Sequence, residues 1–249
     1  MQQTSSLTRY YRIFRIIIHT ITGLIIAAAI FPLLQNNTKL KLTTWWCGGL
    51  LRAFAIKVRI FGNLPANDGK GILFVANHVS WADIHALNSC IKLRFIAKSD
   101  IKNWPVFGYL ATRVNTLFID RSKRQEAGNI VATTCASLVA GDNLCFFPEG
   151  TTTDGTHILS FKSSVLQAAI DANTMLWPVA IRYTNKDGSI NTQMAYAGKT
   201  GLVESMKAVL NVKNPVVELH FLVPIFTEGK NRRELTLQAY NQIKAALSF

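Results

Sequence analysis

Three short apolar runs in the chain each end abruptly in polar or charged residues. The runs cover residues 71–76, 115–119 and 143–147, and stretches of helical character separate them. Runs of this length are typical of buried strands, and strands that alternate with helices indicate the α/β class. In open α/β sheets, functional sites gather at the strand ends. The sequence therefore predicts a mostly parallel or mixed central sheet flanked by helices, with one site where the three runs end.

The first run ends in Asn77-His78, and Asp83 follows shortly after. We expect Ser80 to cap a helix that starts near residue 81, which places His78 in a strand-to-helix turn and Asp83 in the first helical turn. A carboxylate there can reach an imidazole nitrogen and fix its tautomer, as a general-base histidine requires. The same residues also fit a structural role alone, in which Asp83 caps the helix and His78 only completes the turn.

The third run ends in Pro148-Glu149-Gly150. Proline interrupts the hydrogen bonding of a strand, and glycine permits a backbone angle that other residues avoid. This pattern predicts a sharp turn that presents the Glu149 carboxylate at the same edge of the sheet as His78.

Four segments of the chain resemble, in order, the four motif blocks of the glycerolipid acyltransferase family, the family of 1-acylglycerol-3-phosphate acyltransferase. They are Asn77-His78 with Asp83, Phe118-Ile119-Asp120-Arg121, Phe147-Pro148-Glu149-Gly150-Thr151 and Trp177-Pro178-Val179. The likeness covers about residues 55–225. It implies acyl transfer with His78 and Asp83 as the catalytic pair, a thioester donor (acyl-CoA or acyl-carrier protein), and neither a metal nor a bound cofactor.

The resemblance also implies roles for residues around this pair. Arg121 would bind a phosphate or carboxylate of the acceptor, because guanidinium pairs with both in bidentate geometry; a solvated turn arginine is the alternative. Glu149 and Thr151 would order the pocket or contact acceptor oxygens, and backbone N–H groups near Gly150 would stabilise the oxyanion. The other predicted substrate-binding residues are Asn77, two candidate anion contacts, Lys98 and Lys162, and Pro178, which would shape the acyl groove.

One position departs from the family pattern. In members that form phosphatidate, the third motif commonly continues with an arginine linked to the acceptor phosphate, and here that position is Thr152. A threonine hydroxyl supplies no positive charge. The first expectation is a lysolipid acceptor of the 1-acyl-sn-glycerol-3-phosphate type, giving phosphatidic acid, with lyso-ornithine lipid or another lysophospholipid as the alternative.

Two other classes of function were weighed. A serine hydrolase needs a nucleophilic serine on a sharp elbow of the Gly-x-Ser-x-Gly kind, and the sequence has none. A non-catalytic membrane-binding homologue would require a broken catalytic set, whereas His78, Asp83 and Glu149 are all present.

The chain is strongly basic, with a formal net charge of +13, and 49% of its residues are hydrophobic. Such a charge suits an anionic membrane surface or nucleic acid. No zinc-finger spacing, aromatic RNA-binding signature or basic helix supports nucleic acid, so the lipid bilayer is the expected partner. The spacing of the four cysteines fits no metal motif, which favours free thiols in a reducing compartment.

Residues 1–54 are predicted to form a membrane-associated helical segment, and residues 55–249 the acyltransferase domain. Residues 16–34 carry no formal charge apart from His19, and as a helix they would be about 28 Å long, close to the ~30 Å of a hydrocarbon core. The run is long for a cleaved signal peptide, and residues 32–36 lack a small-residue cleavage site. The resemblance also implies a membrane-associated N-terminal segment.

Two arrangements of this segment were considered besides an ordinary buried core helix. A single span would place the catalytic domain across the membrane from cytosolic donors. A hairpin in one leaflet avoids this, with residues 42–56 as its second arm and Trp45 and Trp46 at the interface. Three arginines before residue 16 favour a cytoplasmic N-terminus. We therefore expect a hairpin on the cytoplasmic face of the inner (plasma) membrane.

Overall fold

The computed structural model describes residues 4–65, 71–120 and 124–247. Within them, seven strands form one sheet in the order β1-β7-β6-β2-β5-β3-β4. Every neighbouring pair is parallel except β6 and β7, which are antiparallel. The strands are β1 Lys57–Phe61, β2 Leu73–Ala76, β3 Arg94–Lys98, β4 Leu117–Ile119, β5 Leu144–Phe146, β6 Leu176–Thr184 and β7 Val216–Phe221. The predicted mixed α/β sheet is confirmed.

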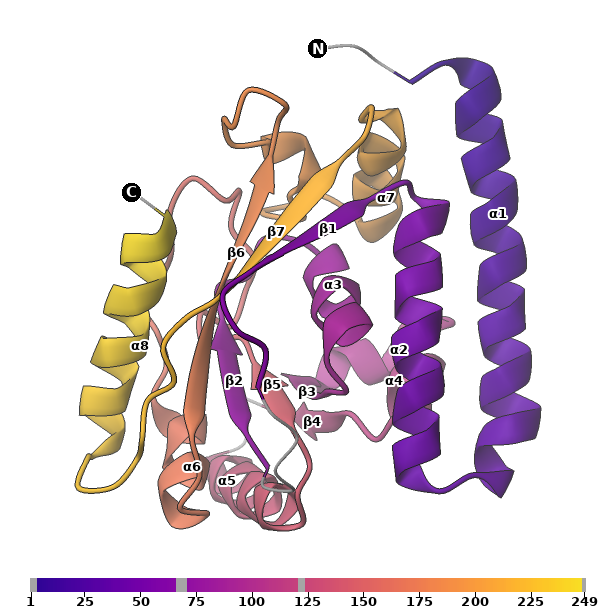
Figure 1. Cartoon of the computed structure of the whole chain (residues 1–249). Helices are drawn as coiled ribbons and strands as arrows, with labels where there is room; N and C mark the ends of the chain where they lie inside the picture. The colour runs from indigo at the N-terminus through magenta and orange to yellow at the C-terminus, as the bar shows by residue number, and fades with distance from the viewer. Residues whose placement is uncertain (1–3, 66–70, 121–123, 248–249) are drawn as a thin grey trace.

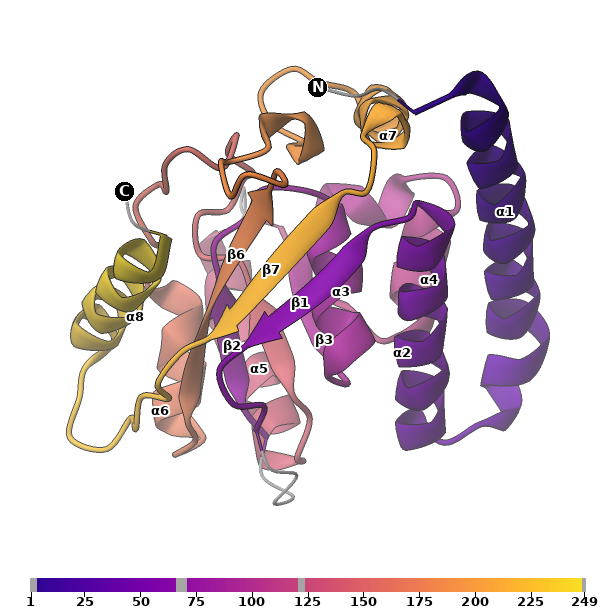
Figure 2. The same ribbon diagram turned by 45° about the horizontal axis from the view of Figure 1, so that its top comes forward.

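Helices cover both faces of the sheet (Figures 1 and 2). Side chains of β2 alternate between the two layers: Leu73 and Val75 pack in the cluster that includes α5, α6 and α8, while Phe74 and Ala76 pack in the cluster that includes α2, α3 and α7. Because both faces are buried, β2 is an unbroken apolar run. The helices are α1 Ser6–Ile25, α2 Asn36–Ala53, α3 Ala82–Cys90, α4 Phe107–Arg113, α5 Arg124–Val139, α6 Gln167–Asp171, α7 Leu202–Asn211 and α8 Arg232–Leu247.

Residues 161–173 do not form one continuous helix. A short 3-10 turn at Ser164–Leu166 is followed by α6, of only five residues. The Lys162 N–H donates to the carbonyl of Pro148 instead of entering a helix. The Lys162 backbone is thus bonded to the loop that carries Pro148-Glu149-Gly150.

Helices α1 and α2 lie side by side on the outside of the α3 layer, with α1 outermost (Figure 1). The second helix begins at Asn36 and ends at Ala53, whereas the predicted second arm covered residues 42–56. Reciprocal bonds join the arms of this helical hairpin: His19 Nε2 lies 2.8 Å from the Trp46 carbonyl, and Trp46 Nε1 donates to the His19 carbonyl at 3.0 Å. Gly23 makes room for the indole, since a Cβ there would lie 2.3 Å from Trp46 Nε1.

The helical segment Ser6–Leu33 is long and apolar enough to cross a membrane, and only 17% of its most apolar window is buried. Its low burial argues against an ordinary core helix. The helix is nevertheless fixed to the rest of the fold, because the buried Arg12 guanidinium donates to the carbonyls of Leu210 and Val212 at the end of α7. Cationic groups at a helix C-terminus satisfy its last carbonyls.

Candidate functional site

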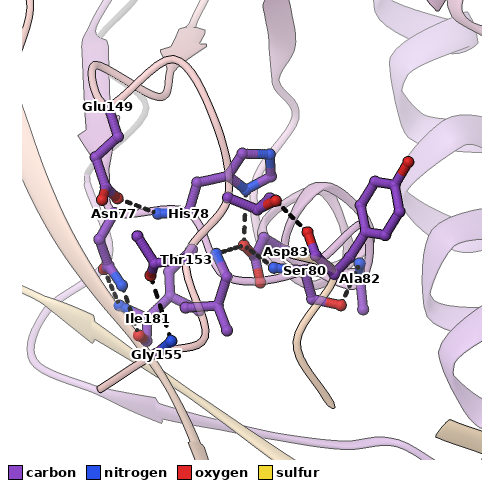
Figure 3. A network of polar contacts seen from close by, with 12 residues as sticks. Asn77, His78, Ser80, Ala82, Asp83, Glu149, Thr153, Gly155 and Ile181 are labelled. Atoms are coloured by element: carbon purple, nitrogen blue, oxygen red, sulfur yellow. Dashed lines mark hydrogen bonds and ion pairs between the residues drawn. The ribbon is translucent and has the colours of Figure 1, made fainter. Parts of the chain in front are cut away.

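The site lies where β2 ends, in the turn between β2 and α3 (Figure 3). Asn77 continues the strand pairing with its side chain: its Nδ2 donates to the Ile181 carbonyl at 2.9 Å, and its Oδ1 accepts from the Ile181 N–H at 2.7 Å. Asn77 is 2% exposed, and its amide both donates to and accepts from the Ile181 backbone. These bonds hold the turn, and the predicted role of Asn77 in substrate binding stays a prediction.

His78 and Asp83 form the predicted pair. His78 Nδ1 lies 2.8 Å from Asp83 Oδ2, and the carboxylate is fully buried. Because a carboxylate accepts, Nδ1 carries the proton and the lone pair stands on Nε2. Within the described residues, Nε2 has no hydrogen-bond partner, so it is available to accept a proton from a bound hydroxyl.

Asp83 is held by three further donors. Its Oδ2 also accepts from the N–H groups of Val79 at 2.7 Å and Ser80 at 2.9 Å, and its Oδ1 accepts from the Tyr183 hydroxyl at 2.6 Å. These bonds compensate for burying the charge. The Asp83 side chain thus closes the turn from within the helix, while Trp81 occupies the N-cap position without a side-chain cap. Ser80 lies one residue before this position, and its Oγ accepts from the Ala82 N–H at 3.4 Å, so the predicted capping contact is present although Trp81 is the N-cap residue.

Tyr183 was missed by the sequence analysis. It lies in β6, a hundred residues from Asp83, and is 2% exposed. Burial first, and then the charge of Asp83, raise the pKa of its phenol well above the usual range. The hydroxyl therefore stays protonated and remains a donor to the carboxylate.

The Pro-Glu-Gly loop lies next to His78 and is bonded to its backbone. Glu149 Oε1 accepts from the His78 backbone N–H at 2.7 Å, and Oε2 accepts from the Leu159 N–H at 2.8 Å. Burial raises the pKa of the Glu149 carboxyl, and these two backbone bonds oppose that shift. Glu149 thus orders the pocket, one of its two predicted roles.

Gly150 adopts the expected left-handed conformation, with φ of 75°. Its N–H donates to the Phe147 carbonyl at 3.1 Å, so this group is engaged in the turn and is not a free oxyanion donor as predicted. The next N–H, of Thr151, has no partner within the described residues, and the Thr151 side chain is exposed.

Thr152, at the position that departs from the family pattern, is tied to a neighbouring loop. Its hydroxyl donates to the Tyr196 carbonyl, and the Tyr196 N–H donates to the Val79 carbonyl at 2.8 Å. The Thr153 N–H donates to the His78 carbonyl at 2.9 Å. This loop therefore supports the turn that carries His78 through its backbone, and the Thr152 hydroxyl is bonded within the protein.

Stacked aromatic rings link His78 to the wall of an apolar cavity. The imidazole stacks on Phe147 with ring centroids 3.9 Å apart, and Phe147 stacks on Phe95 at 5.9 Å. Phe95 lines a cavity of about 170 Å³ between the hairpin, α3 and α4. Other residues on its wall are Ala27, Trp46, Ile84, His85 and Leu110.

The remaining predicted residues are more dispersed. Lys98 forms an ion pair with Asp100 at the end of β3, and Lys162 is exposed. Pro178 is buried in β6 beside Val75 and is not among the described residues that line the cavity. Arg121 lies outside the described residues.

The described residues contain no group of three His, Cys, Asp or Glu side chains that could hold a metal ion. The four cysteines are free thiols, and burial raises the pKa of the Cys145 thiol, which lies behind the site in β5. The reactive features of the described site are therefore an oriented imidazole, a buried carboxylate and an adjoining apolar cavity. These groups suit proton abstraction from a hydroxyl next to a long apolar substrate.

A family model described as "Acyltransferase" matches residues 55–182, a little more than half of the chain. The chain belongs to the acyltransferase family. The acyltransferase is 35% identical to the lyso-ornithine lipid O-acyltransferase of Pseudomonas aeruginosa, over 83% of this chain and 78% of the relative. It is 33% identical to the 1-acyl-sn-glycerol-3-phosphate acyltransferase of Neisseria meningitidis, over 80% of this chain and 78% of the relative.

The acyltransferase also shares its fold with a solved structure. The crystal structure of the 1-acyl-sn-glycerophosphate acyltransferase PlsC from Thermotoga maritima matches with a TM-score of 0.66, covering 95% of this chain and 96% of that chain at 21% identity. The match extends over the N-terminal helices as well as the sheet, since it leaves only a small part of either chain uncovered.

Proposed function

We propose that this acyltransferase transfers a fatty acyl group from a thioester, acyl-CoA or acyl-carrier protein, to the free hydroxyl of a lysolipid. The observation that carries the proposal is the oriented imidazole: His78 Nδ1 is bonded to the buried Asp83 and Nε2 is free within the described residues. His78 acts as the general base, and Asp83 holds its tautomer and stabilises the imidazolium that forms.

The proposed reaction needs no nucleophile from the protein. The acceptor hydroxyl gives its proton to His78 Nε2 while its oxygen attacks the thioester carbonyl carbon. The carbon–sulfur bond of the tetrahedral intermediate then breaks, and the proton passes from Nε2 to the departing thiolate. The Thr151 N–H follows Gly150 in the chain, has no partner within the described residues, and is the candidate donor for the oxyanion. No cofactor takes part.

The apolar cavity supports an acyl substrate. Phe147 and Phe95 connect it to the His78 ring, and its wall is almost entirely apolar. An alkyl chain gains roughly 0.8 kcal/mol for each methylene that it buries. The proposed reaction places the acyl chain in this cavity and its carbonyl at His78.

The acceptor is either 1-acyl-sn-glycerol-3-phosphate or lyso-ornithine lipid. These are the acceptors that appear in the names of the two relatives. The use of Thr152 for a backbone bond favours lyso-ornithine lipid, whose carboxylate and ammonium groups place less negative charge in the site than a phosphate does. A phosphate acceptor would instead depend on Arg121 and on lysines such as Lys98 and Lys162.

Membrane association at the cytoplasmic face is part of the proposal. The outer side of α1 exposes large apolar side chains, and the chain carries a net charge of +13 that suits anionic lipid. With the hairpin in one leaflet, the catalytic turn stays on the side where thioester donors are made.

An acceptor screen tests this proposal. Membranes that contain the protein are supplied with labelled palmitoyl-CoA or palmitoyl-carrier protein and with either acceptor, and diacyl products are identified by mass spectrometry. We expect transfer to lyso-ornithine lipid, and a shift toward 1-acyl-sn-glycerol-3-phosphate in Thr152→Arg. Thr156→Arg, on an exposed part of the same loop, is the matched control. No transfer with any pair would contradict the proposal and favour a non-catalytic membrane protein.

A further inference from the structure

A polar groove of about 790 Å³ lies apart from the His78 turn. One wall is the end of β6 and the loop that follows it, residues 184–193, and the other is the end of α7 with residues 212–214. Among the described residues, none that lines the apolar cavity, and none of the His78 turn, also lines this groove. The proposed reaction therefore leaves the groove without a role.

The buried side chain of Asn191 offers the groove a hydrogen-bond donor. Asn191 is 4% exposed, and its Oδ1 accepts from the Gln193 N–H at 3.1 Å. Its Nδ2 has no hydrogen-bond partner among the described residues, yet it is not one of the unpaired atoms that lack accessible surface. Buried polar groups are nearly always paired, so this amide calls for a partner from outside the protein.

The two carboxylates near the groove are already paired. Asp187, in the turn after β6, accepts from the Ser189 hydroxyl at 2.6 Å and from its N–H at 3.0 Å. Glu218 accepts from the Thr184 hydroxyl at 3.1 Å and forms an ion pair with Arg59 at 3.5 Å. These bonds reduce the repulsion that an anion in the groove would meet.

Four more side-chain amides line the groove. Nδ2 of Asn185 is bonded within its own turn, and Oδ1 of Asn211 accepts from Arg9 at 3.3 Å. The Asn211 Nδ2 and the exposed amides of Gln193 and Asn214 make no side-chain hydrogen bonds among the described residues. Together with Asn191, they present several N–H donors to one ligand.

Two lysines place positive charge beside these donors. Lys186 is exposed and has no ion-pair partner among the described residues, and Lys213 lies on the opposite wall. The C-terminal end of α7 is electronegative, but the Arg12 guanidinium offsets this by donating to the carbonyls of Leu210 and Val212. Amide donors together with ammonium groups suit a phosphate, which accepts hydrogen bonds at all of its free oxygens.

We propose that the groove binds a phosphate group, with the Asn191 amide as its buried donor and Lys186 as the cation at its rim. An anionic lipid headgroup is one source. The Asn211 carbonyl accepts from the Thr4 N–H at 3.2 Å, and the exposed apolar face of α1 begins at Leu7, so the groove adjoins that end of α1 (Figures 1 and 2). A soluble phosphate compound would meet the same donors. The proposal does not depend on acyl transfer.

Two binding measurements distinguish the sources. In the first, sn-glycerol 3-phosphate is titrated into the full-length protein in a zwitterionic detergent, and the heat of binding is measured by calorimetry. In the second, the protein is sedimented with vesicles of phosphatidylcholine, with or without phosphatidylglycerol. Binding in the second measurement alone identifies a lipid headgroup, and binding in the first identifies a phosphate group that is recognised without a bilayer.

Matched variants separate this groove from the general positive charge of the protein. Asn191→Asp keeps the oxygen that accepts from Gln193 and replaces the Nδ2 donor with an anionic oxygen, so phosphate binding should weaken at least about tenfold. Asn231→Asp makes the same change at the start of α8, where Oδ1 likewise accepts backbone N–H groups. Lys186→Gln should weaken binding about threefold, and Lys244→Gln, on the exposed side of α8, is its control.

Weaker binding in both groove variants than in their controls, in either measurement, is the expected result. Circular dichroism checks folding, and Lys186→Gln, on an exposed turn, decides the test if Asn191→Asp does not fold. Equal binding of groove and control variants in both measurements, or no binding of the unsubstituted protein in either, would overturn the proposal. Failure of the proposed function would appear instead as absent transfer in the acceptor screen.

Discussion

Asp83 and His85 lie two residues apart on α3, yet their surroundings are opposite. Asp83 accepts four hydrogen bonds from residues of the turn and of β6. His85 faces tryptophan edges and an apolar cavity with its Nδ1 unpaired. Residues two apart on a helix point in different directions, so one short helix presents a hydrogen-bonded polar face to the His78 turn and an apolar wall to the cavity.

The two sides of α3 are held by different means. The polar side is fixed by complete hydrogen bonding, so removing any partner should change the reaction or the stability. The apolar side is defined by shape and by one unsatisfied group, so its substitutions should change which substrate is used more than how fast it reacts.

The largest effect is expected for Asp83→Asn on the polar side. An amide cannot accept from all four donors, and it no longer fixes the His78 tautomer. We expect kcat to fall by about 10⁴ per folded molecule. Steady-state transfer rates check this, with circular dichroism to correct for the folded fraction. A variant with the kcat of the unsubstituted protein would remove Asp83 from the mechanism.

Asn77→Ala should mainly affect stability. It removes two bonds and leaves the Ile181 N–H and carbonyl unsatisfied between strands, which costs about 2–4 kcal/mol in the free energy of unfolding. Urea unfolding measures the loss. Asn37→Ala, which removes an exposed contact to Lys92, serves as the control and should stay within about 0.5 kcal/mol. Similar losses for both would show that the Asn77 amide is unimportant to the turn.

Tyr183→Phe should slow the reaction by about tenfold through loss of one donor to Asp83. The KM for both substrates should remain unchanged, because Tyr183 is buried behind the carboxylate and contacts neither substrate. Tyr109→Phe, at a partly exposed site on α4, is the matched control. Unchanged kcat in Tyr183→Phe would mean that the turn N–H groups alone position Asp83.

The smallest expected effect is the contribution of Glu149 to the pH dependence of stability. The pKa of the Glu149 carboxyl in the folded protein is raised above its ordinary 4.5. The folded protein therefore binds the proton of this carboxyl more tightly than the unfolded chain does. The contribution of Glu149 to stability is thus fully present below the ordinary pKa and is lost as the pH rises through the raised value. Urea unfolding of the protein and of Glu149→Gln from about pH 4 to about pH 8 tests this. The stability of the protein relative to the variant should decline with pH, and a rise would contradict the assignment.

The polar side of α3 could largely be predicted from the sequence because its parts are contiguous. The apolar run, His78 and Asp83 lie within a dozen residues, so strand, turn and helix follow from local pattern. Tyr183 could not be predicted, because only the parallel pairing of β2 with β6 brings it to Asp83.

The apolar side could not be predicted, since its cavity is assembled from the hairpin, α3, β3 and α4. Helix α4 was missed because Trp104-Pro105 indicates a loop, and the helix starts only after Val106, which has a φ of 64°. Helix α7 was also missed, although Glu204 bonds back to the Gly201 N–H in a recognisable cap.

The most direct test of the account is the transfer rate of purified His78→Ala in vesicles, with labelled palmitoyl-CoA and the acceptor that the unsubstituted protein uses. The account predicts that the variant binds vesicles like the unsubstituted protein and forms no diacyl product above the protein-free background. Turnover near that of the unsubstituted protein would show that Nε2 of His78 does not take the acceptor proton, and would contradict the central claim.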